Sequence, residues 1–342
     1  MMATKPLTTA GTTDHYRLLE VDARASPEVI HAAYRALMKE YAPRTAGADD
    51  SIARALNEAF GVLKDASRRK RYDEQEATKR KGLIGPYRLL HQVAQGGFGT
   101  TYKAEHTLAG GYSCIKHCSE VSAHAEDILR QETQAIWNLQ HSGLPGMRDL
   151  LQLPDKSFAL AMSWIEGPTL QQLVEKHGRL DPENVAWIAE RLLNTLAHLH
   201  RHGVLHGDIK PQNIIVQEES HIVVLVDFGL SMAKPSATSG NKGHTDLFSP
   251  PEQMVGKTIV PGSDFYSLGM TMIYALGGGY GAVERKDVPA NLPDEMCAFI
   301  RSLIVRNVLE RPRAAADLFE KFKDARLKSF GRAHSNMKQF TV

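Results

Sequence analysis

The residues best suited to chemistry are densest in one stretch, "VLHGDIKPQNIIV", at residues 204–216. It places Asp208, Lys210 and Asn213 in order inside an apolar frame. Asp227 follows directly after a second apolar stretch, "HIVVLV". Because Mg²⁺ prefers oxygen ligands, the Asp227 carboxylate and the Asn213 amide suit a magnesium ion.

A glycine-rich stretch, "VAQGGFGTTY" at residues 93–102, comes earlier in the chain. Glycines between two strands let backbone N–H groups approach phosphate oxygens closely. Alone, such a stretch is more simply explained as an ordinary hairpin turn. The ordered set of charged residues that follows it favours a phosphate-binding loop.

Two further charged residues lie between these stretches. Lys116, in "SCIK", is placed where a strand lysine reaches phosphates. Glu132 lies in "RQETQAIWNLQ", which we expect to be helical, and it could pair with Lys116 and hold it in position.

The elements that must position these residues change type along the chain. Residues 87–106 and 111–118 have the pattern of three strands, the first two flanking the glycines. Residues 182–200 and 263–276 have the pattern of long helices. Strands first and helices later predict an α+β arrangement.

Taken together, residues 87–325 resemble the catalytic core of eukaryotic-type serine/threonine protein kinases, and the stretches "QGGFGTTY" and "PPEQ" look most like bacterial members. The resemblance implies a bilobal fold and ATP binding. Gly96 and Gly99 match the second and third glycines of the family's phosphate loop, whereas Ala94 departs from the first. The implied nucleotide-binding residues are Val93, Ala94, Gly96, Gly97, Phe98, Gly99, Thr101, Lys116, Met162 as gatekeeper, Ser163 and Ile165.

The resemblance also implies catalytic roles, since phosphoryl transfer needs positioning and charge neutralisation. Asp208 would accept or orient the proton of the attacking hydroxyl, and Lys210 would stabilise the transferring group. Asn213 and Asp227 would hold Mg²⁺, with Mn²⁺ as an alternative. Lys116 and Glu132 would complete the site.

Four more positions match parts of the family's framework. Glu252 is expected to pair with Arg311, and Asp264 to brace the catalytic loop. Thr245 is expected near Asp208 and, with Lys210, favours Ser or Thr acceptors over Tyr. Gly207 stands where the family usually has an arginine that meets a phosphate on the activation segment, so we expect activity to depend little on that phosphate.

The front of the chain, residues 14–73, resembles a DnaJ-type J-domain. We expect a helical hairpin, with helices starting at Ser26-Pro27 and at Ser51. The loop that carries His-Pro-Asp in the family reads Tyr41-Ala42-Pro43-Arg44 here, so only the proline remains. A DnaK-type chaperone is therefore not the expected partner; localisation or regulation through another protein is.

Composition sets the remaining expectations. The 342 residues are 42% hydrophobic and 23% charged with a net charge of +2, as in an ordinary globular protein. The three cysteines are too few for a disulfide framework, and no run of about 18 apolar residues predicts a membrane span. We expect a cytoplasmic protein that binds protein substrates and no nucleic acid. Residues 1–13 should be disordered, 74–86 a linker, and 326–342 a loose basic tail.

Three functions remain open from the sequence. The first is an active Ser/Thr protein kinase that acts on other proteins and on itself. The second is a pseudokinase scaffold, favoured only by Ala94. The third is a chaperone adaptor that acts through the J-like region.

Overall fold

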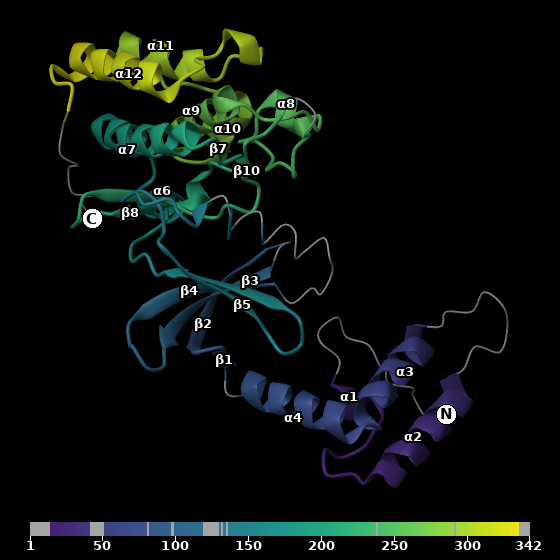
Figure 1. The fold of residues 1–342 in the computed structure, drawn as a ribbon. Coiled ribbons are helices and arrows are strands. Elements are labelled where there is room, and N and C mark those ends of the chain that lie inside the picture. The colour runs from purple at the N-terminus through teal and green to yellow at the C-terminus, as the bar shows by residue number, and fades with distance from the viewer. Residues whose placement is uncertain are drawn as a thin grey trace. The chain divides into compact units, whose positions relative to one another are not determined.

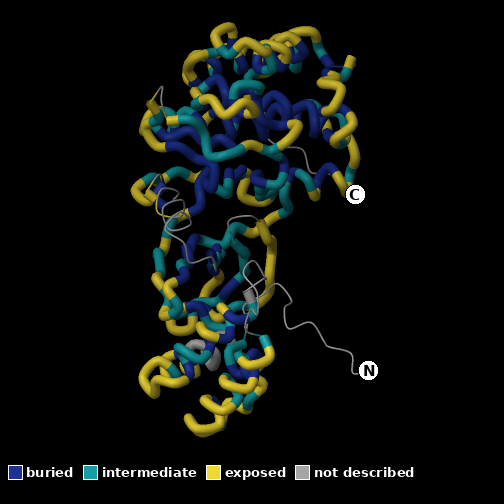
Figure 2. Tube along the Cα trace, turned by 90° about the vertical axis from the view of Figure 1, so that its right-hand side faces the viewer, coloured by how far each residue is buried: buried dark blue, intermediate teal, exposed yellow. Residues whose placement is uncertain are grey.

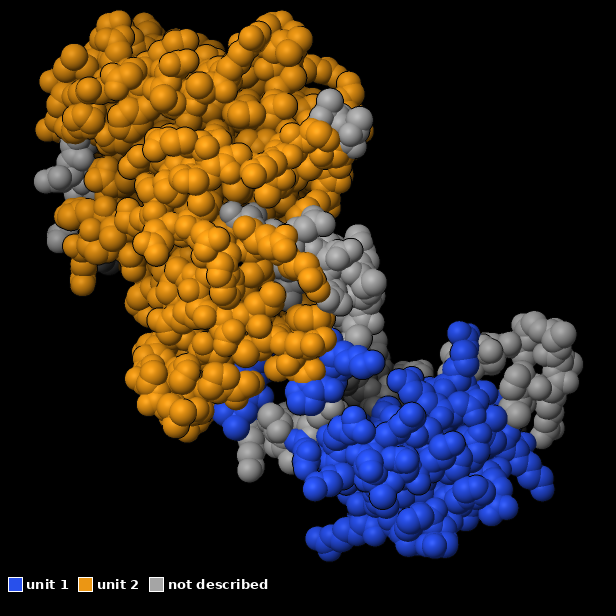
Figure 3. Space-filling model, viewed as in Figure 1, with its two compact units in different colours: residues 1–84, 154–156 blue, residues 85–153, 157–342 orange. Residues whose placement is uncertain are grey.

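The computed structural model divides the chain into two compact units (Figures 1 and 3). Unit 1 comprises residues 1–84 and 154–156, and unit 2 comprises residues 85–153 and 157–342. The structure describes residues 14–41, 51–80, 82–96, 99–118, 130, 133–134, 136–236, 239–290 and 292–334. The expected disorder of residues 1–13 and the altered loop at residues 42–44 therefore lie outside the described residues.

Unit 1 is helical, as predicted. Its helices are α1 (His15–Leu18), α2 (Pro27–Tyr41), α3 (Ser51–Leu63) and α4 (Ala66–Arg80), followed by the short strand β1 (Leu83–Ile84). The apolar faces of α2 and α3 meet in a small core, in which Ile30 and Leu56 are fully buried. The Tyr34 and Phe60 rings stack with centroids 4.0 Å apart. The two helix starts at Pro27 and Ser51 are those that the sequence predicts.

Helix α4 extends into the segment expected to be a linker. Residues 74–80 are helical and continue α4 to Arg80. Its sequence, "ASRRKRYDEQEATKR", is rich in residues with high helix propensity and has no Gly or Pro before Gly82. Helix α4 therefore ends close to the glycine- and proline-containing segment that starts at Gly82, and not at the charged residues from Glu74 onward.

The first half of unit 2 is an antiparallel sheet of strands in the order β2-β3-β4-β6-β5. Their bounds are β2 (Tyr87–Gly96), β3 (Gly99–His106), β4 (Tyr112–Cys118), β5 (Met147–Gln152) and β6 (Phe158–Ser163). Strands β2, β3 and β4 are those expected around the glycines and Lys116. The β3–β4 register puts Lys116 opposite Thr101, next to the glycine-rich turn.

The second half of unit 2 is mainly helical (Figure 1). Its α-helices are α6 (Leu170–His177), α7 (Pro182–Arg201), α8 (Pro251–Met254), α9 (Pro261–Gly277), α10 (Tyr280–Arg285), α11 (Asp294–Leu303) and α12 (Ala315–Phe330). The short elements are β7 (Val204–Leu205), η1 (Pro211–Asn213), β8 (Ile214–Gln217), β9 (Ile222–Leu225), β10 (Met232–Ala233) and η2 (Val308–Glu310). This confirms the α+β fold with a β-rich and a helical lobe.

Helices α7 and α9 form the centre of the helical lobe. Asp181 caps α7 by accepting a 2.8 Å hydrogen bond from the Glu183 N–H, and Pro182 occupies the first turn. Every residue of α9 from Gly262 to Leu276 is buried, and this lobe contains the longest buried runs in Figure 2. Helix α9, which carries Asp264, is thus part of the buried core of this lobe.

The C-terminal residues differ from the expected loose tail. Helix α12 runs five residues past residue 325 and ends at Phe330, where Gly331 adopts φ 72°. Arg326 is 1% exposed and pairs with Glu190 on α7. Arg332 donates to both carboxylate oxygens of Glu183, at 2.8 and 2.7 Å. Two buried acids on α7 explain why these basic residues are ordered; residues 335–342 lie outside the described part.

Within the part of the chain that the structure describes, no helix is both long and apolar enough to cross a membrane.

Candidate active site

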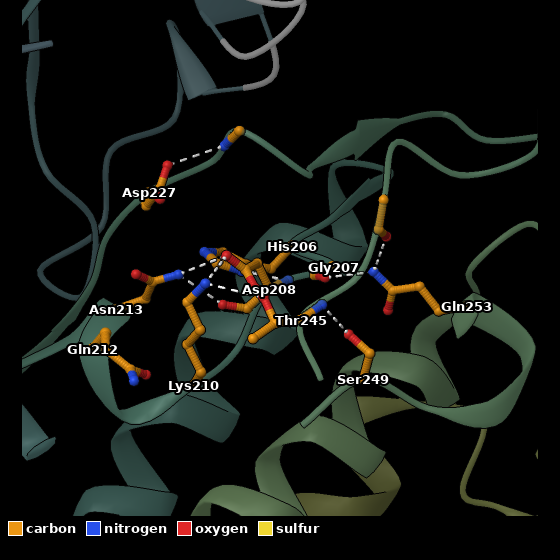
Figure 4. A network of polar contacts seen from close by, with 12 residues as sticks. His206, Gly207, Asp208, Lys210, Gln212, Asn213, Asp227, Thr245, Ser249 and Gln253 are labelled. Atoms are coloured by element: carbon orange, nitrogen blue, oxygen red, sulfur yellow. Dashed lines mark hydrogen bonds and ion pairs between the residues drawn. The ribbon is translucent and has the colours of Figure 1, made fainter. Parts of the chain in front are cut away.

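The loop that carries Asp208 (Figure 4) connects β7 to η1. A buried carboxylate from α9, that of Asp264, holds this loop. Asp264 accepts hydrogen bonds from the N–H groups of His206 at 3.0 Å and Gly207 at 2.8 Å, and it contacts His200 Nε2 at 2.8 Å. Burial favours a raised Asp264 pKa, but His200, His206 and the Gly207 N–H outweigh it and lower the pKa. Asp264 is therefore an ionised anchor, in the bracing position that the sequence predicts.

His206 fixes the same loop from inside. Its ring is fully buried and packs edge-on against Phe228, with centroids 4.7 Å apart. Burial is the main cause that lowers its pKa. Nδ1 accepts a 3.2 Å hydrogen bond from the Asp208 N–H. The side chains of Asp264 and His206 thus hold the backbone from His206 to Asp208 by hydrogen bonds.

Asp208, Lys210 and Thr245 form a triangle of polar contacts. Lys210 Nζ lies 2.8 Å from Asp208 Oδ2 and donates to Thr245 Oγ1 at 3.0 Å. Thr245 Oγ1 in turn donates to Asp208 Oδ1 at 2.7 Å. The expected proximity of Thr245 to Asp208 is present. The triangle combines a carboxylate that can accept a proton with a cation suited to a phosphoryl oxygen.

Asn213 and Asp227 present oxygen atoms next to this triangle. Asn213 Nδ2 donates to the Asp208 carbonyl at 2.9 Å and to Asp208 Oδ2 at 3.0 Å. Since the amide nitrogen is engaged, the amide oxygen is the atom left for a cation. Asp227 has φ 64°, and its Oδ1 accepts from Lys116 Nζ at 2.8 Å and from the Gly229 N–H at 3.3 Å.

The Asp227 carboxylate is ionised at neutral pH. Burial favours a raised pKa, but the Lys116 ammonium and the Gly229 N–H outweigh it and hold the Asp227 pKa at about 2. This anion and the Asn213 oxygen fit Mg²⁺, which takes few protein ligands and completes its shell with water and substrate phosphates. The described residues contain no cluster of three or more His, Cys, Asp or Glu that could hold a metal ion by themselves.

The glycine-rich hairpin is described except for Gly97 and Phe98. Ala94 pairs with Thr101, and Gly96 with Gly99. Gly99 has φ 132°, and an added Cβ would lie 2.3 Å from the His117 carbonyl oxygen, so only glycine fits there. A Cβ at Gly96 would meet nothing within 4 Å. Ala94 and Val93 are exposed on β2, and an alanine is therefore compatible with the hairpin backbone.

The expected adenine-binding segment follows β6. Met162 is buried and pairs with Cys114 of β4. The Ser163 N–H donates to the Gly146 carbonyl at 2.8 Å, so it cannot also donate to adenine. Among the described residues, the Ile165 N–H makes no backbone hydrogen bond. Ile165 is therefore the better candidate donor.

One cluster beside this segment was not predicted. Lys103 Nζ lies 4.4 Å from the centroid of the Tyr112 ring and 4.7 Å from that of Trp164. Glu166 accepts from Lys103 Nζ at 3.4 Å and from Trp164 Nε1 at 2.5 Å. Cation–π contacts of this kind fix the segment to β3. No spacing in the sequence links Lys103 to Trp164.

Three further predicted residues are Glu132, Glu252 and Arg311. Glu132 lies outside the described residues, so its pairing with Lys116 stays a prediction. Glu252 and Arg311 form the expected pair, with Arg311 Nη1 and Nη2 donating at 2.7 and 2.9 Å. Gln253, the residue after Glu252, contacts the catalytic loop and was not singled out from the sequence.

Comparison with known proteins agrees with this geometry. A family model described as the protein kinase domain matches residues 87–282, and one described as the DnaJ domain matches residues 14–73. Serine/threonine-protein kinase F of Synechocystis is 30% identical over 221 residues, which cover 57% of this chain and 44% of that protein.

Two further relatives come from other bacteria. Serine/threonine-protein kinase PrkC of Bacillus subtilis is 30% identical over 205 residues, covering 58% of this chain and 31% of that protein. Serine/threonine-protein kinase PknA of Mycobacterium tuberculosis is 28% identical over 250 residues, covering 67% and 58%. The chain thus spans about a third to three fifths of the length of these relatives.

Proposed function

Because the chain belongs to the protein kinase family, we propose that it transfers the γ-phosphoryl group of ATP to serine and threonine hydroxyls of proteins, its own included. The observation that carries this proposal is the triangle of Asp208, Lys210 and Thr245, with the oxygens of Asn213 and Asp227 beside it. In this proposal these side chains supply the base, the cation and the metal ligands that the chemistry requires.

The proposed reaction is an in-line displacement at the γ-phosphorus. The substrate hydroxyl oxygen forms a bond to that phosphorus while the bond to the β–γ bridging oxygen breaks, and ADP leaves. Asp208 orients the hydroxyl and accepts its proton. Lys210 balances charge on the equatorial oxygens, and Thr245 keeps both side chains in register.

Asn213 and Asp227 would hold the divalent cation, Mg²⁺ or Mn²⁺, since both ions take hard oxygen donors. The cation would neutralise phosphate charge. Lys116 serves two purposes in this proposal: it keeps Asp227 ionised and in place, and it reaches the nucleotide's phosphates when ATP is bound.

A pseudokinase is the second candidate, and Ala94 was its only support. Ala94 is exposed on β2. An alanine at this position removes none of the charged or polar side chains that we propose to contact ATP or the metal ion. The test is incubation of the full chain with labelled ATP, Mg²⁺ and a peptide mixture, followed by analysis of the phosphorylated amino acids. We expect label on Ser and Thr; label on none of them, or on Tyr alone, would overturn the proposal.

For unit 1 we propose a localisation or regulatory role through a protein partner, rather than a role as chaperone adaptor. The match to the DnaJ domain supports an interaction module, and the sequence at residues 42–44 lacks the His and Asp used toward DnaK-type chaperones. The full chain should therefore not stimulate a DnaK-type ATPase; stimulation that is lost in Pro43→Ala would restore the adaptor role. The cytoplasmic location and the absence of a nucleic-acid partner stay predictions.

A further inference from the structure

Gln253, on the short helix α8, connects two segments that are distant in sequence (Figure 4). Its side-chain Nε2 donates to the Gly207 carbonyl at 2.7 Å and to the Gly243 carbonyl at 2.9 Å. The residue is 1% exposed. Its amide oxygen has no hydrogen-bond partner among the described residues. Burying that oxygen is costly, so the benefit of this side chain lies in its two donated bonds.

The first bond fixes the peptide next to Asp208. Gly207 has φ 73°, and an added Cβ would lie 2.8 Å from the Leu230 carbonyl oxygen. Asp264 holds the N–H of Gly207, and Gln253 holds its carbonyl. The two peptide units on either side of the Gly207 Cα are thereby restrained, and the second of them joins Gly207 to Asp208.

The second bond fixes the segment that carries Thr245. The Gly243 N–H donates to Asn241 Oδ1 at 3.0 Å. Asn241 Nδ2 donates to the backbone carbonyls of Gln253 at 2.8 Å and Lys257 at 2.9 Å. Gly243 is two residues before Thr245, whose hydroxyl contacts Asp208.

These contacts join neutral amide and carbonyl groups, so none of them needs a phosphate. Gly207 offers no side chain with which to bind a phosphate. We propose that Gln253 is a positioning residue that holds residues 239–249 against the catalytic loop, so that Thr245 and Asp208 are aligned in the unphosphorylated protein. This inference rests on the proposed kinase function and concerns how that site is regulated.

The test compares the full-length wild type with Gln253→Met, Gln253→Glu and the exposed control Gln140→Met. All four are treated with phosphatase, and loss of phosphate is verified by mass. Methionine has the length of glutamine but donates no hydrogen bond. We expect kcat for peptide phosphorylation to fall about 10- to 100-fold in Gln253→Met, with KM for ATP within about twofold of the wild type. Gln140→Met should match the wild type.

Two readouts separate positioning from general damage. A buried carboxyl has a raised pKa and donates a hydrogen bond only when protonated. The kcat of Gln253→Glu relative to wild type should therefore rise from pH 8 to pH 6, while that of Gln253→Met stays flat. Amide hydrogen exchange over residues 239–249 should be faster in Gln253→Met and unchanged over α9.

The outcomes distinguish the two proposals. If the wild type transfers phosphate and Gln253→Met does so equally well, with unchanged exchange over residues 239–249, the positioning role is wrong and the kinase function stands. If the wild type transfers phosphate only after phosphorylation of residues 228–249, the positioning role is also wrong. If the wild type never transfers phosphate, the kinase function fails, and the positioning role fails with it.

Discussion

Thr245 Oγ1 donates a 2.7 Å hydrogen bond to Asp208 Oδ1 and accepts one from Lys210 Nζ at 3.0 Å. The hydroxyl is thus the link between the proposed base and the proposed phosphate-binding cation. Valine has the same shape without the hydroxyl. Because hydrogen bonds to charged groups contribute about 1.5–3 kcal/mol, Thr245→Val should lower kcat about 10- to 100-fold.

Steady-state kinetics on a peptide substrate measures this effect. Thr245→Ser keeps the hydroxyl and should retain most of the activity, which makes it the matched control. Equal kcat for the valine variant and the wild type would show that the Thr245 hydroxyl does not contribute to catalysis.

The ion pair of Glu252 and Arg311 should be a large contributor to stability. The Arg311 side chain is fully buried, and it also donates to the carbonyls of Val305, Arg306 and Gly262. Glu252→Gln leaves the guanidinium without its counter-charge and should cost about 3–5 kcal/mol of unfolding free energy. Urea unfolding measures it.

The control for that experiment is the exposed pair of Arg88 and Glu105, 3.7 Å apart. Arg88→Gln should change the unfolding free energy by less than about 1 kcal/mol, because surface pairs are screened. A loss of equal size in both variants would contradict the difference between buried and exposed pairs.

The end of the chain gives a test of the domain boundary. A chain truncated after Ala325 loses Arg326 and Arg332, and it leaves Glu190 and Glu183 on α7 without these partners. We expect it to be less stable by about 3–5 kcal/mol than a chain truncated after His334. The single variant Arg326→Met should account for most of the loss; equal stability of the two truncated chains would support the boundary at 325.

A histidine on α7 should make stability sensitive to acid. His198 Nε2 is buried and has no hydrogen-bond partner in the described part of the chain. Burial is the main cause that lowers the pKa of His198, and His141, with a ring centroid 5.0 Å away, adds to it. The unfolded chain therefore binds a proton more readily, so stability is present above about pH 6.5 and is lost as the pH falls below it.

His198→Leu removes this titration and the unpartnered nitrogen. Urea unfolding at pH 7.5 and 5.5 should show a smaller loss on acidification in the variant than in the wild type. An identical loss in both proteins would show that His198 does not contribute.

The sequence was most informative where one residue type is needed for a reaction or a backbone conformation. Asp208, Lys210, Asn213 and Asp227 were singled out by their order and by the resemblance to protein kinases. The structure places Lys210 and Asn213 in contact with Asp208, and the catalytic and metal-binding roles stay predictions. Gly99 was identified by its match to the phosphate loop of the kinase family, and its φ of 132° explains why that position requires glycine. The Glu252–Arg311 pair followed from the resemblance to protein kinases.

Contacts between surfaces distant in sequence could not be predicted. The pairing of Arg326 with Glu190 depends on how α12 packs on α7. From the sequence alone, basic residues in this region are equally compatible with a solvent-exposed tail. The cluster of Lys103, Tyr112 and Trp164 depends on strand register. Gln253 is a neutral residue, and its proposed role depends on hydrogen bonds to two backbone carbonyls. Every residue has a backbone carbonyl, so the sequence does not indicate which ones Gln253 contacts.

The central claim is that this chain is an active kinase with Asp208 as its base, and single-turnover transfer of labelled phosphate from ATP to a serine peptide tests it most directly. General base catalysis contributes about 10²- to 10⁴-fold. Asp208→Asn, which keeps the size of the side chain but removes its charge, should lower the transfer rate by that factor while ATP still binds. A rate within twofold of the wild type would contradict the claim.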